Sequence, residues 1–226
     1  MEDQLAIRLI PAAILEPKIR LVDGGEVITA AAFDLEAIMA EERHPREHRL
    51  ANPGVAKKAL FSIEASTWRA NRFNREGGPG AYYAATTLPA AIEEIRWHLG
   101  HDEGIPFDKT QVYRAVTSKT KGRYLDLRPA KNMGALSPDP RRSYPAGAGL
   151  ADLARDRGLD GVIYRSVRHP SGTCMAIFDE KSISGIRLGQ LVSFERSKEN
   201  AKDWNYRVHI PEHLAQAHQQ AMAMAR

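Results

Sequence analysis

The sequence of 226 residues contains one cysteine and no long apolar run. The single cysteine, Cys174, excludes an internal disulfide and favours a reducing compartment. No segment reaches the roughly 20 apolar residues that a membrane-spanning helix requires. The N-terminal segment begins with acids and interrupts its apolar run at Arg8 and Pro11, unlike a secretory signal peptide. We therefore expect a cytoplasmic protein without a membrane partner.

The chain also lacks a strong excess of charge of one sign. It has 32 Lys and Arg against 28 Asp and Glu, a net charge of +4. Nucleic-acid-binding proteins usually concentrate their cations on one element, whereas here the cations are spread along the chain. Two local clusters, Lys119–Lys121–Arg123 and Arg141–Arg142, are interpreted as solvated loops, with an acidic partner or a phosphate as the alternative. A nucleic-acid-binding or ribonuclease module is therefore a less favoured interpretation.

Several motifs of cofactor and metal enzymes are missing from the sequence. No G-x-G-x-x-G follows a strand pattern, and neither a Walker A sequence nor H-E-x-x-H occurs. One cysteine cannot supply a cysteine-rich zinc site. We expect no Rossmann cofactor site and no metal.

Hydrophobic periodicity indicates helices and strands in irregular order. The apolar segment 5–15 predicts an edge strand or a short element ending at Pro17, and residues 56–66 a strand or a short helix. Helices are expected over residues 30–43, 88–100, 148–158 and 211–226, with a loop rich in Pro and Gly over 129–147. Strands are expected after the glycine-rich turn at 77–80, and at 111–116, 123–128, 160–167, 173–178, 190–195 and 205–210.

This order lacks regular βαβ alternation, so we predict an α+β fold. The expected architecture is a single domain with a mixed sheet and flanking helices. We divide the chain into an N-terminal extension packed on the core (residues 1–60), a catalytic core (61–210) and a C-terminal helix (211–226).

The helix over 88–100 carries a candidate catalytic carboxylate. Its buried stripe is formed by residues at helical spacing: Leu88, Ile92, Ile95 and Leu99. Glu93 falls nearly opposite this stripe, whereas Glu94 lies on its flank, beside His98. A carboxylate at this margin can point into a cleft while its helix stays anchored. The alternative is an i,i+4 pair between Glu94 and His98.

The segment before this helix offers cations and aromatic rings. Arg72 and Arg75 flank Asn74, and a pair of guanidinium groups can hold a diphosphate, although surface charge is the alternative. Tyr82 and Tyr83 are adjacent in a strand, so their rings face opposite sides. One ring belongs to the core, and the other is available to stack on a planar ligand.

Ser166 lies at the end of a predicted strand, on the same face as Val162 and Tyr164. Without a convincing His–Asp partner, its hydroxyl is a poor nucleophile and is interpreted as a hydrogen-bonding group. A cation, an aromatic platform, a carboxylate and a hydroxyl together suit the cleavage of the nicotinamide–ribose bond of NAD⁺. This reaction passes through an oxocarbenium-like state, which a fixed carboxylate can stabilise by about 3–4 kcal/mol.

Two sequence runs resemble the signatures of one known family. The run RFNREGGPGAYYAATTLPAAIEEIRWH resembles the core signature of the RES-domain toxins, and DGVIYRSVRHPSGTCMAIF resembles their second signature. The two runs stand in the expected order, and weaker similarity extends over nearly the whole chain. The resemblance implies a fold similar to the ADP-ribosyltransferase core of diphtheria-type toxins.

The resemblance also implies site residues. The arginine, glutamate and serine of the family name correspond to Arg72, Glu94 and Ser166, and the glutamate is chosen by its distance from His98. The family tyrosine falls on Tyr83 when counted from Glu94 and on Tyr82 when counted from Arg72.

These residues would each have a role at the dinucleotide. Arg72 would grip phosphate, the tyrosine would stack on nicotinamide, and Glu94 would stabilise the ribosyl cation. Ser166 would bind the nicotinamide–ribose end, and Asn74 would contribute to binding. Arg8 and Arg168 are further candidates for phosphate contacts, although ordinary salt bridges are the favoured interpretation of both.

Family membership implies a toxin of a bacterial toxin–antitoxin pair that arrests growth and uses NAD as its substrate. The expected activity is transfer of ADP-ribose to a protein target, for example an enzyme of nucleotide metabolism. The alternatives are an NAD glycohydrolase and an NAD phosphorylase. The expected partner is an antitoxin with an Xre-like DNA-binding region, so that DNA is contacted only indirectly. The loop 129–147 is a candidate surface for a protein acceptor. A catalytically inactive interaction domain is a less favoured alternative.

Overall fold

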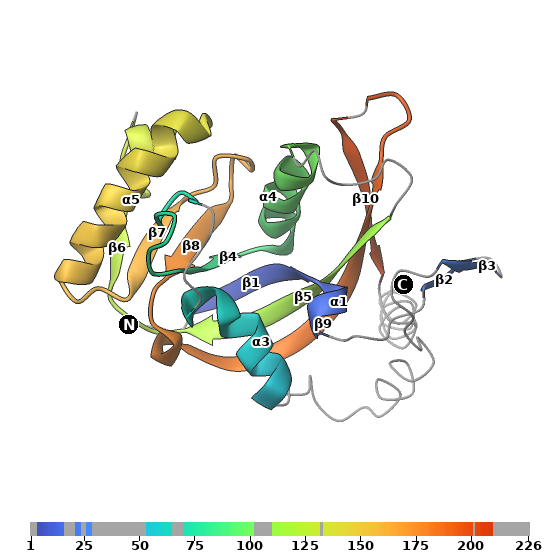
Figure 1. Ribbon diagram of the computed structural model, residues 1–226, viewed down its shortest axis with the longest axis horizontal. Coiled ribbons are helices and arrows are strands. Elements are labelled where there is room, and N and C mark those ends of the chain that lie inside the picture. The colour runs from blue at the N-terminus through green and yellow to red at the C-terminus, as the bar shows by residue number, and fades with distance from the viewer. Residues whose placement is uncertain are drawn as a thin grey trace, which may run out of the picture.

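The computed structural model describes residues 4–15, 21–23, 26–28, 53–64, 70–101, 110–131, 133–200 and 202–209. Its strands are β1 (Gln4–Pro11), β2 (Leu21–Asp23), β3 (Glu26–Ile28), β4 (Tyr82–Ala85), β5 (Gln111–Thr120), β6 (Tyr124–Asp126), β7 (Gly161–Arg165), β8 (Thr173–Ile177), β9 (Ile183–Arg196) and β10 (Trp204–His209). Its helices are α1 (Ala12–Leu15), α3 (Pro53–Glu64), α4 (Leu88–His101) and α5 (Pro140–Asp156), with short 3₁₀ helices η1 (Gly134–Leu136) and η2 (Glu180–Ser182) (Figure 1). The helices predicted over 30–43 and 211–226 lie outside the described residues.

One 8-stranded sheet organises the described chain, in the order β10-β9-β5-β1-β4-β8-β7-β6. Strands β6 and β7 are parallel, and the other neighbours in this sheet are antiparallel. The prediction of an α+β fold with a mixed sheet is therefore confirmed. A separate two-stranded sheet pairs β2 with β3.

Strand β1 lies in the middle of the large sheet, so its prediction as an edge strand was wrong. It pairs with β5 from Gln4↔Thr120 to Pro11↔Tyr113 and contacts β4 at Ile7↔Ala85. The physical reason is that both of its faces carry apolar side chains, which suits a strand covered on both sides. Residues 4–11 thus belong to the central sheet, while the domain boundaries at 60 and 210 stay a prediction.

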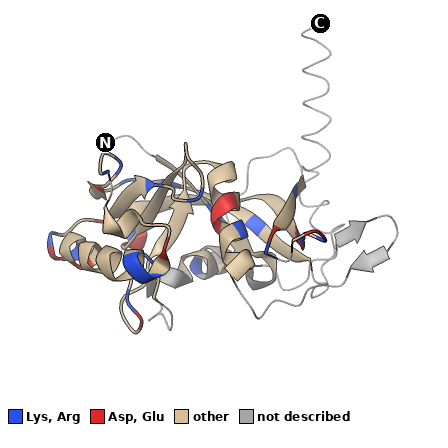
Figure 2. Ribbon diagram, turned by 90° about the horizontal axis from the view of Figure 1, so that it is seen from above, with Lys and Arg blue, Asp and Glu red and all other residues tan. Residues whose placement is uncertain are grey.

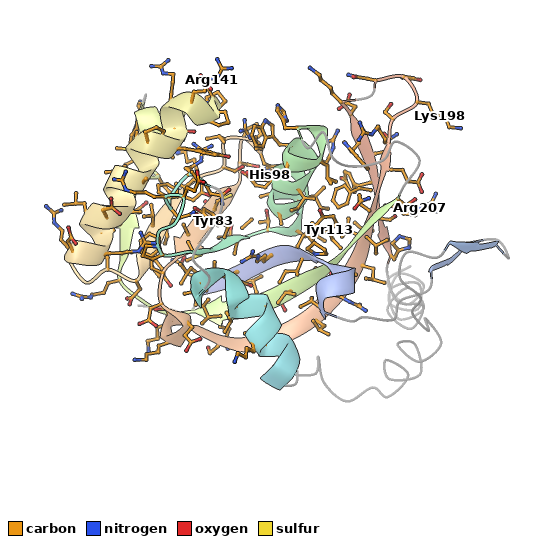
Figure 3. All side chains as sticks on the ribbon, in the orientation of Figure 1. Tyr83, His98, Tyr113, Arg141, Lys198 and Arg207 are labelled. Atoms are coloured by element: carbon orange, nitrogen blue, oxygen red, sulfur yellow. The ribbon has the colours of Figure 1, made fainter. Side chains whose placement is uncertain are left out.

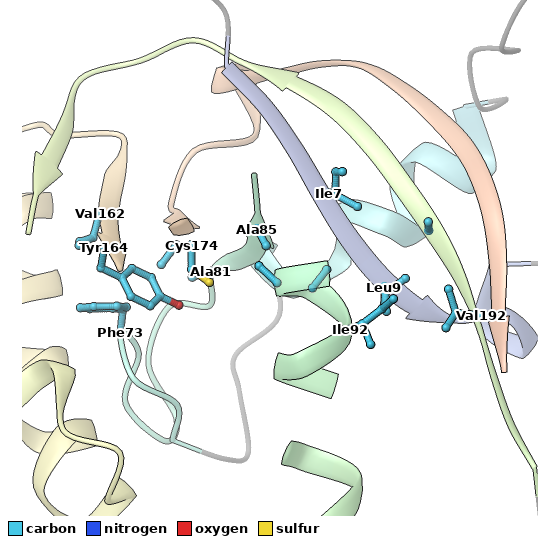
Figure 4. Packing of buried hydrophobic residues seen from close by; sticks show 14 of the residues in the cluster. Ile7, Leu9, Phe73, Ala81, Ala85, Ile92, Val162, Tyr164, Cys174 and Val192 are labelled. Carbon is cyan, nitrogen blue, oxygen red and sulfur yellow. The ribbon is translucent and has the colours of Figure 1, made fainter. Parts of the chain in front are cut away.

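Helices cover both faces of the sheet, and Figure 1 shows α4 and α3 on opposite sides. On one face, side chains of α4 and α5 join a cluster that includes Ile92, Ala151 and Leu9 (Figure 4). On the other face, α1 and α3 contribute Leu15 and Ala59 to a second cluster. Alternation along the strands separates these two sets of side chains.

Helix α4 follows the predicted periodicity. Ile92 and Leu99 are buried, and Leu88 and Ile95 pack against the same cluster while remaining partly exposed. Its start fits the rule that proline is tolerated in the first turn, where Pro89 stands.

Helix α5 begins at Pro140 and not at residue 148, which corrects both the predicted short helix and the loop 129–147. Asp139 caps the helix by accepting a hydrogen bond from the Arg141 backbone N–H at 3.0 Å, and proline is favourable at the first helical position. The proline and glycine content of the segment concealed this start. Gly147 serves close packing instead, because a Cβ there would overlap the carbonyl oxygen of Arg72.

The remaining sequence expectations agree with the structure. Of the two alternatives for residues 56–66, the helix is present as α3, and each predicted strand from 111 onward has a counterpart. Among the described helices, none combines the length and apolarity needed to cross a bilayer. Figure 2 shows Lys and Arg distributed over several elements, in agreement with their spread along the sequence.

Candidate active site

A cavity of about 250 Å³ opens on the face of the sheet that carries α4. Ligand sites commonly span about 300–1,000 Å³, so this cavity suits a small ligand or part of a larger one. Its charged, aromatic and sulfur-containing lining residues are Arg8, Arg72, Tyr83, Glu94, Trp97, His98, Tyr144, Tyr164, Arg168 and Cys174. Figure 3 labels Tyr83 and His98 in the region between α4 and α5. Of the residues predicted for the site, Arg72, Tyr83 and Glu94 thus share one cavity.

Glu94 projects from α4 into this cavity and is the one carboxylate among the described residues that line it. Its Oε1 accepts a hydrogen bond from the Ser166 hydroxyl at 2.7 Å, and the Cys174 thiol lies 3.7 Å from the same oxygen. Neighbouring Glu93 instead accepts a hydrogen bond from Arg96 at 2.9 Å, in a partly buried position outside this cavity. The two adjacent glutamates therefore have different environments, as the helical projection predicts.

Ser166 lies directly behind Glu94, just after β7, and is 8% exposed. Besides donating to Glu94, its Oγ accepts hydrogen bonds from the backbone N–H groups of Arg168 (3.1 Å) and His169 (3.0 Å). A hydroxyl has one donor and two acceptor lone pairs, so these three bonds use its full capacity. This geometry orients the Glu94 carboxylate. The predicted bond from Ser166 to the nicotinamide–ribose end would have to replace one of these three hydrogen bonds.

Close packing brings Ser166 to Glu94. In the turn between β7 and β8, a Cβ on Gly172 would lie 2.8 Å from the Ala90 Cβ and 3.1 Å from the Ser166 Cβ. Both distances are too short for an added methyl group without movement of the turn. Glycine at this position therefore lets the turn lie against the first part of α4.

Tyr83 faces the cavity, whereas Tyr82 packs on the other side of the sheet in the cluster with α3. The Tyr83 hydroxyl donates to Asn74 Oδ1 at 2.8 Å and accepts from the Phe73 backbone N–H at 2.9 Å. Burial raises the pKa of Tyr83 well above its ordinary value, so the hydroxyl stays protonated. The ring is left as a wall of the cavity. Asn74 and Tyr82, both predicted to contact ligand, are not among the residues that line it.

Arg72 is 8% exposed and spans two segments of the chain. Its Nη1 donates to the carbonyl oxygens of Ala135 (2.6 Å) and Ser137 (3.0 Å). Arg72 thus connects the glycine-rich loop to η1 and places a fixed positive charge in the cavity wall.

The other arginines considered for phosphate binding occupy three different environments. Arg75 forms a surface ion pair with Asp152 at 2.6 Å, in agreement with the surface-charge alternative. The Arg8 guanidinium lies 4.9 Å from the centre of the Tyr82 ring, which belongs to the opposite face. Arg168 lines the cavity, with its guanidinium 3.9 Å from the centre of the Trp97 ring.

Sequence reasoning did not assign Trp97, Tyr144, Tyr164 or Cys174 to the site. Trp97 stands three residues after Glu94, so helical spacing could have indicated it, and Tyr144 lies in the segment read as a loop. Tyr164 and Cys174 are paired across β7 and β8. The Tyr164 ring packs 4.9 Å from that of Phe73, next to Cys174 (Figure 4).

The Cys174 thiol is 2% exposed. Burial, followed by the Glu94 charge, raises its pKa well above the usual value, so the group remains a thiol. No group of three or more His, Cys, Asp or Glu side chains suited to a metal ion occurs within the described part of the chain.

Comparisons with known proteins identify a family and a similar chain in a solved complex. A family model described as the RES domain matches residues 43–197. No curated protein matches the sequence. Among solved structures, the chain is similar to one in the crystal structure of the M. tuberculosis MbcT–MbcA toxin–antitoxin complex, with 14% identity and a TM-score of 0.44. The match covers 86% of this chain and 85% of that chain.

Proposed function

We propose that this chain, which belongs to the RES-domain family, cleaves the nicotinamide–ribose bond of NAD⁺. The observation that carries the proposal is the cavity with one carboxylate, Glu94, held by Ser166 and surrounded by aromatic rings and arginines. This set of groups suits a substrate with a planar aromatic ring, a ribose and a diphosphate.

The chemistry follows from the charge that develops at the ribose. When the bond between the ribose C1′ and the nicotinamide nitrogen breaks, its electron pair leaves with nicotinamide and the ribose becomes cationic. A carboxylate fixed beside this centre stabilises the cation, a contribution worth about 3–4 kcal/mol by analogy with preorganised charges of opposite sign. We assign this role to Glu94.

The neighbouring residues support binding and orientation. The Tyr83 ring offers a platform for nicotinamide, with Asn74 fixing its hydroxyl. Ser166 orients the Glu94 carboxylate through its 2.7 Å hydrogen bond. Arg72 adds a fixed positive charge that favours the anionic dinucleotide.

The acceptor of ADP-ribose defines the enzyme class more finely. We favour transfer to a protein target, with water or phosphate as alternative acceptors. Labelled NAD⁺ added to a bacterial extract with the purified chain separates these cases. Label in one protein band indicates a transferase, free ADP-ribose indicates a glycohydrolase, and a product that requires phosphate indicates a phosphorylase.

We further propose that the chain acts in the cytoplasm as the toxin of a type II toxin–antitoxin pair. Its partner would be an antitoxin with an Xre-like DNA-binding region, and any effect on DNA would pass through that antitoxin. Growth arrest on expression, relieved by co-expression of a cognate antitoxin, would support this assignment.

The direct test compares the two adjacent glutamates of α4. Nicotinamide release from NAD⁺ is measured with the wild-type chain, Glu94→Gln and the matched control Glu93→Gln. We expect Glu94→Gln to lose about 100- to 1,000-fold in rate because the ribosyl cation loses its counter-charge. Glu93→Gln should retain the rate of bond cleavage, since its carboxylate pairs with Arg96 and does not line the cavity that holds Glu94. Unreduced release by a folded Glu94→Gln protein would contradict the proposal.

A further inference from the structure

A second cavity of about 330 Å³ lies next to the first. It is formed between α4, the turn after β7, the connection from β9 to β10 and the start of β10. Its charged lining residues are Glu93, Arg96, Arg168, Lys202 and Asp203. Trp97 and Arg168 line both cavities. These two side chains therefore stand at the junction.

The Arg168 guanidinium is held at this junction by an aromatic ring and a hydrogen bond. It lies 3.9 Å from the centre of the Trp97 ring, and its Nη2 donates to the Pro138 carbonyl oxygen at 3.1 Å. Its Nε is buried and has no hydrogen-bond partner among the described residues. Its backbone N–H donates to Ser166 Oγ, which in turn holds Glu94. One turn of chain thus fixes the position of the carboxylate and that of this cation.

Other arginines near the two cavities have partners of their own. Arg8, which also lines the first cavity, lies 4.9 Å from the centre of the Tyr82 ring. Arg72 uses its Nη1 on two carbonyl oxygens, and Arg75 pairs with Asp152. Arg96, at the second cavity, donates to Glu93 and to the Trp204 carbonyl oxygen and lies 3.6 Å from Asp203. Arg168 makes no ion pair within 4.0 Å with the described carboxylates, and of the described arginines it is the one that lines both cavities.

We propose that Arg168 binds the diphosphate of the dinucleotide at the junction of the two cavities. The nicotinamide riboside half then lies in the first cavity beside Glu94, and the adenosine half lies in the second. This inference rests on the proposed function and names the subsites of the same substrate. It moves the main phosphate contact from Arg72, where the sequence placed it, to Arg168.

Three physical points support this assignment. The diphosphate is the midpoint of NAD⁺ and joins its two nucleoside halves, as Arg168 joins the two cavities. A guanidinium offers forked donors that match phosphate oxygens. The contact with the Trp97 ring restrains the guanidinium before the ligand binds, so less side-chain freedom is lost on binding.

The test measures binding of two fragments by titration calorimetry with the full chain carrying Glu94→Gln, which prevents turnover. Nicotinamide riboside lacks the diphosphate, whereas ADP-ribose contains it. We expect Arg168→Ala to weaken ADP-ribose binding roughly 10- to 100-fold, because a charge-assisted contact is lost, and to change nicotinamide riboside binding by less than about twofold. The matched control Arg75→Ala should leave both affinities unchanged.

Two further variants complete the test. Arg168→Lys keeps the charge but loses the fork, so we expect a smaller, measurable loss for ADP-ribose; this variant also replaces Arg168→Ala if the alanine variant does not fold. Lys202→Glu introduces a negative charge at the second cavity and should weaken ADP-ribose but not nicotinamide riboside.

Different results overturn different parts of the proposal. Unchanged ADP-ribose affinity in a folded Arg168 variant, or an equal loss for both fragments, would overturn the assignment of Arg168 while NAD⁺ cleavage by the wild-type chain still stands. An unchanged ADP-ribose affinity in Lys202→Glu would remove the adenosine half from the second cavity. Failure of the Arg168-containing chain to bind either fragment, together with absence of NAD⁺ cleavage, would overturn the proposed function itself.

Discussion

The two faces of the central sheet are built from neighbouring residues of the same strands but differ in kind. On the face covered by α1 and α3, adjacent strands contribute Tyr82, Ile163 and Met175 to a closed cluster. On the face covered by α4 and α5, the residues adjacent to these in sequence, Tyr83, Tyr164 and Cys174, line the cavity. A one-residue step along a strand thus separates core from candidate site, because successive side chains point to opposite faces.

This difference indicates that one face of the sheet mainly stabilises the fold, while the other also forms the candidate site. The α3 face is the place where substitutions should change stability alone. On the α4 face, polar groups such as Glu94, Ser166 and Asn74 make hydrogen bonds that fix side chains around a space. Substitutions there should lower turnover by more than their loss of apolar contacts alone would predict, because they also release hydrogen bonds that position the site.

The largest effect on stability is expected on the α3 face, from Ile163→Ala. Ile163 is 4% exposed, and truncation of a buried isoleucine costs about 2–5 kcal/mol through lost burial and the cavity that remains. Denaturant unfolding should show this loss, while nicotinamide release per folded molecule stays at the wild-type level. A large fall in turnover at unchanged stability would remove the distinction between the faces.

Replacing each of the adjacent tyrosines by phenylalanine sharpens the comparison further. Tyr83→Phe leaves Asn74 Oδ1 and the Phe73 N–H without their shared partner, which costs about 1–3 kcal/mol and loosens the loop that holds Arg72. We expect lower stability together with a higher KM for NAD⁺. Tyr82→Phe is the control and should leave KM unchanged, since its ring lies on the other face. Equal KM values for the two variants would contradict this assignment.

The smallest effect is expected from Ser166→Ala, which removes a positioning group without touching the ligand. Loss of its hydrogen bond to Glu94 should lower kcat about tenfold, since a bond to a charged group is worth about 1.5–3 kcal/mol. KM should rise by a smaller factor, because the Ser166 hydroxyl also accepts a hydrogen bond from the Arg168 backbone N–H. Ser166→Thr, which keeps a hydroxyl, should recover part of the rate. Ser171→Ala, in the same turn, is the matched control and should behave as the wild type. A rise in KM at constant kcat would instead indicate that Ser166 binds the ligand.

Much of this arrangement follows from local periodicity. The flank position of Glu94 follows from helical spacing, and the opposite orientations of Tyr82 and Tyr83 follow from strand alternation. The antiparallel pairing of β7 and β8 follows from two apolar runs separated by a turn. Each of these depends on residues that are close in the chain.

Features that depend on distant segments were misplaced or missed. The position of β1 in the sheet depends on its pairing with β5, which begins at residue 111. The start of α5 was hidden by its prolines and glycines, and with it the place of Tyr144 beside the cavity. The sequence suggested Arg8, Arg72, Arg75 and Arg168 for phosphate, and their surroundings distinguish them only after folding.

By itself, the sequence determined the α+β class, most strands, the helix that carries Glu94 and the membership of the RES-domain family. Only the tertiary structure decided which of those residues meet: Ser166 reaches Glu94 across 72 positions, and Arg72 reaches Ser137 across 65. The physical reason is that helix and strand patterns are set by neighbours in the chain. The shape of a cavity depends instead on how segments distant in the sequence pack together, and local patterns do not predict this packing.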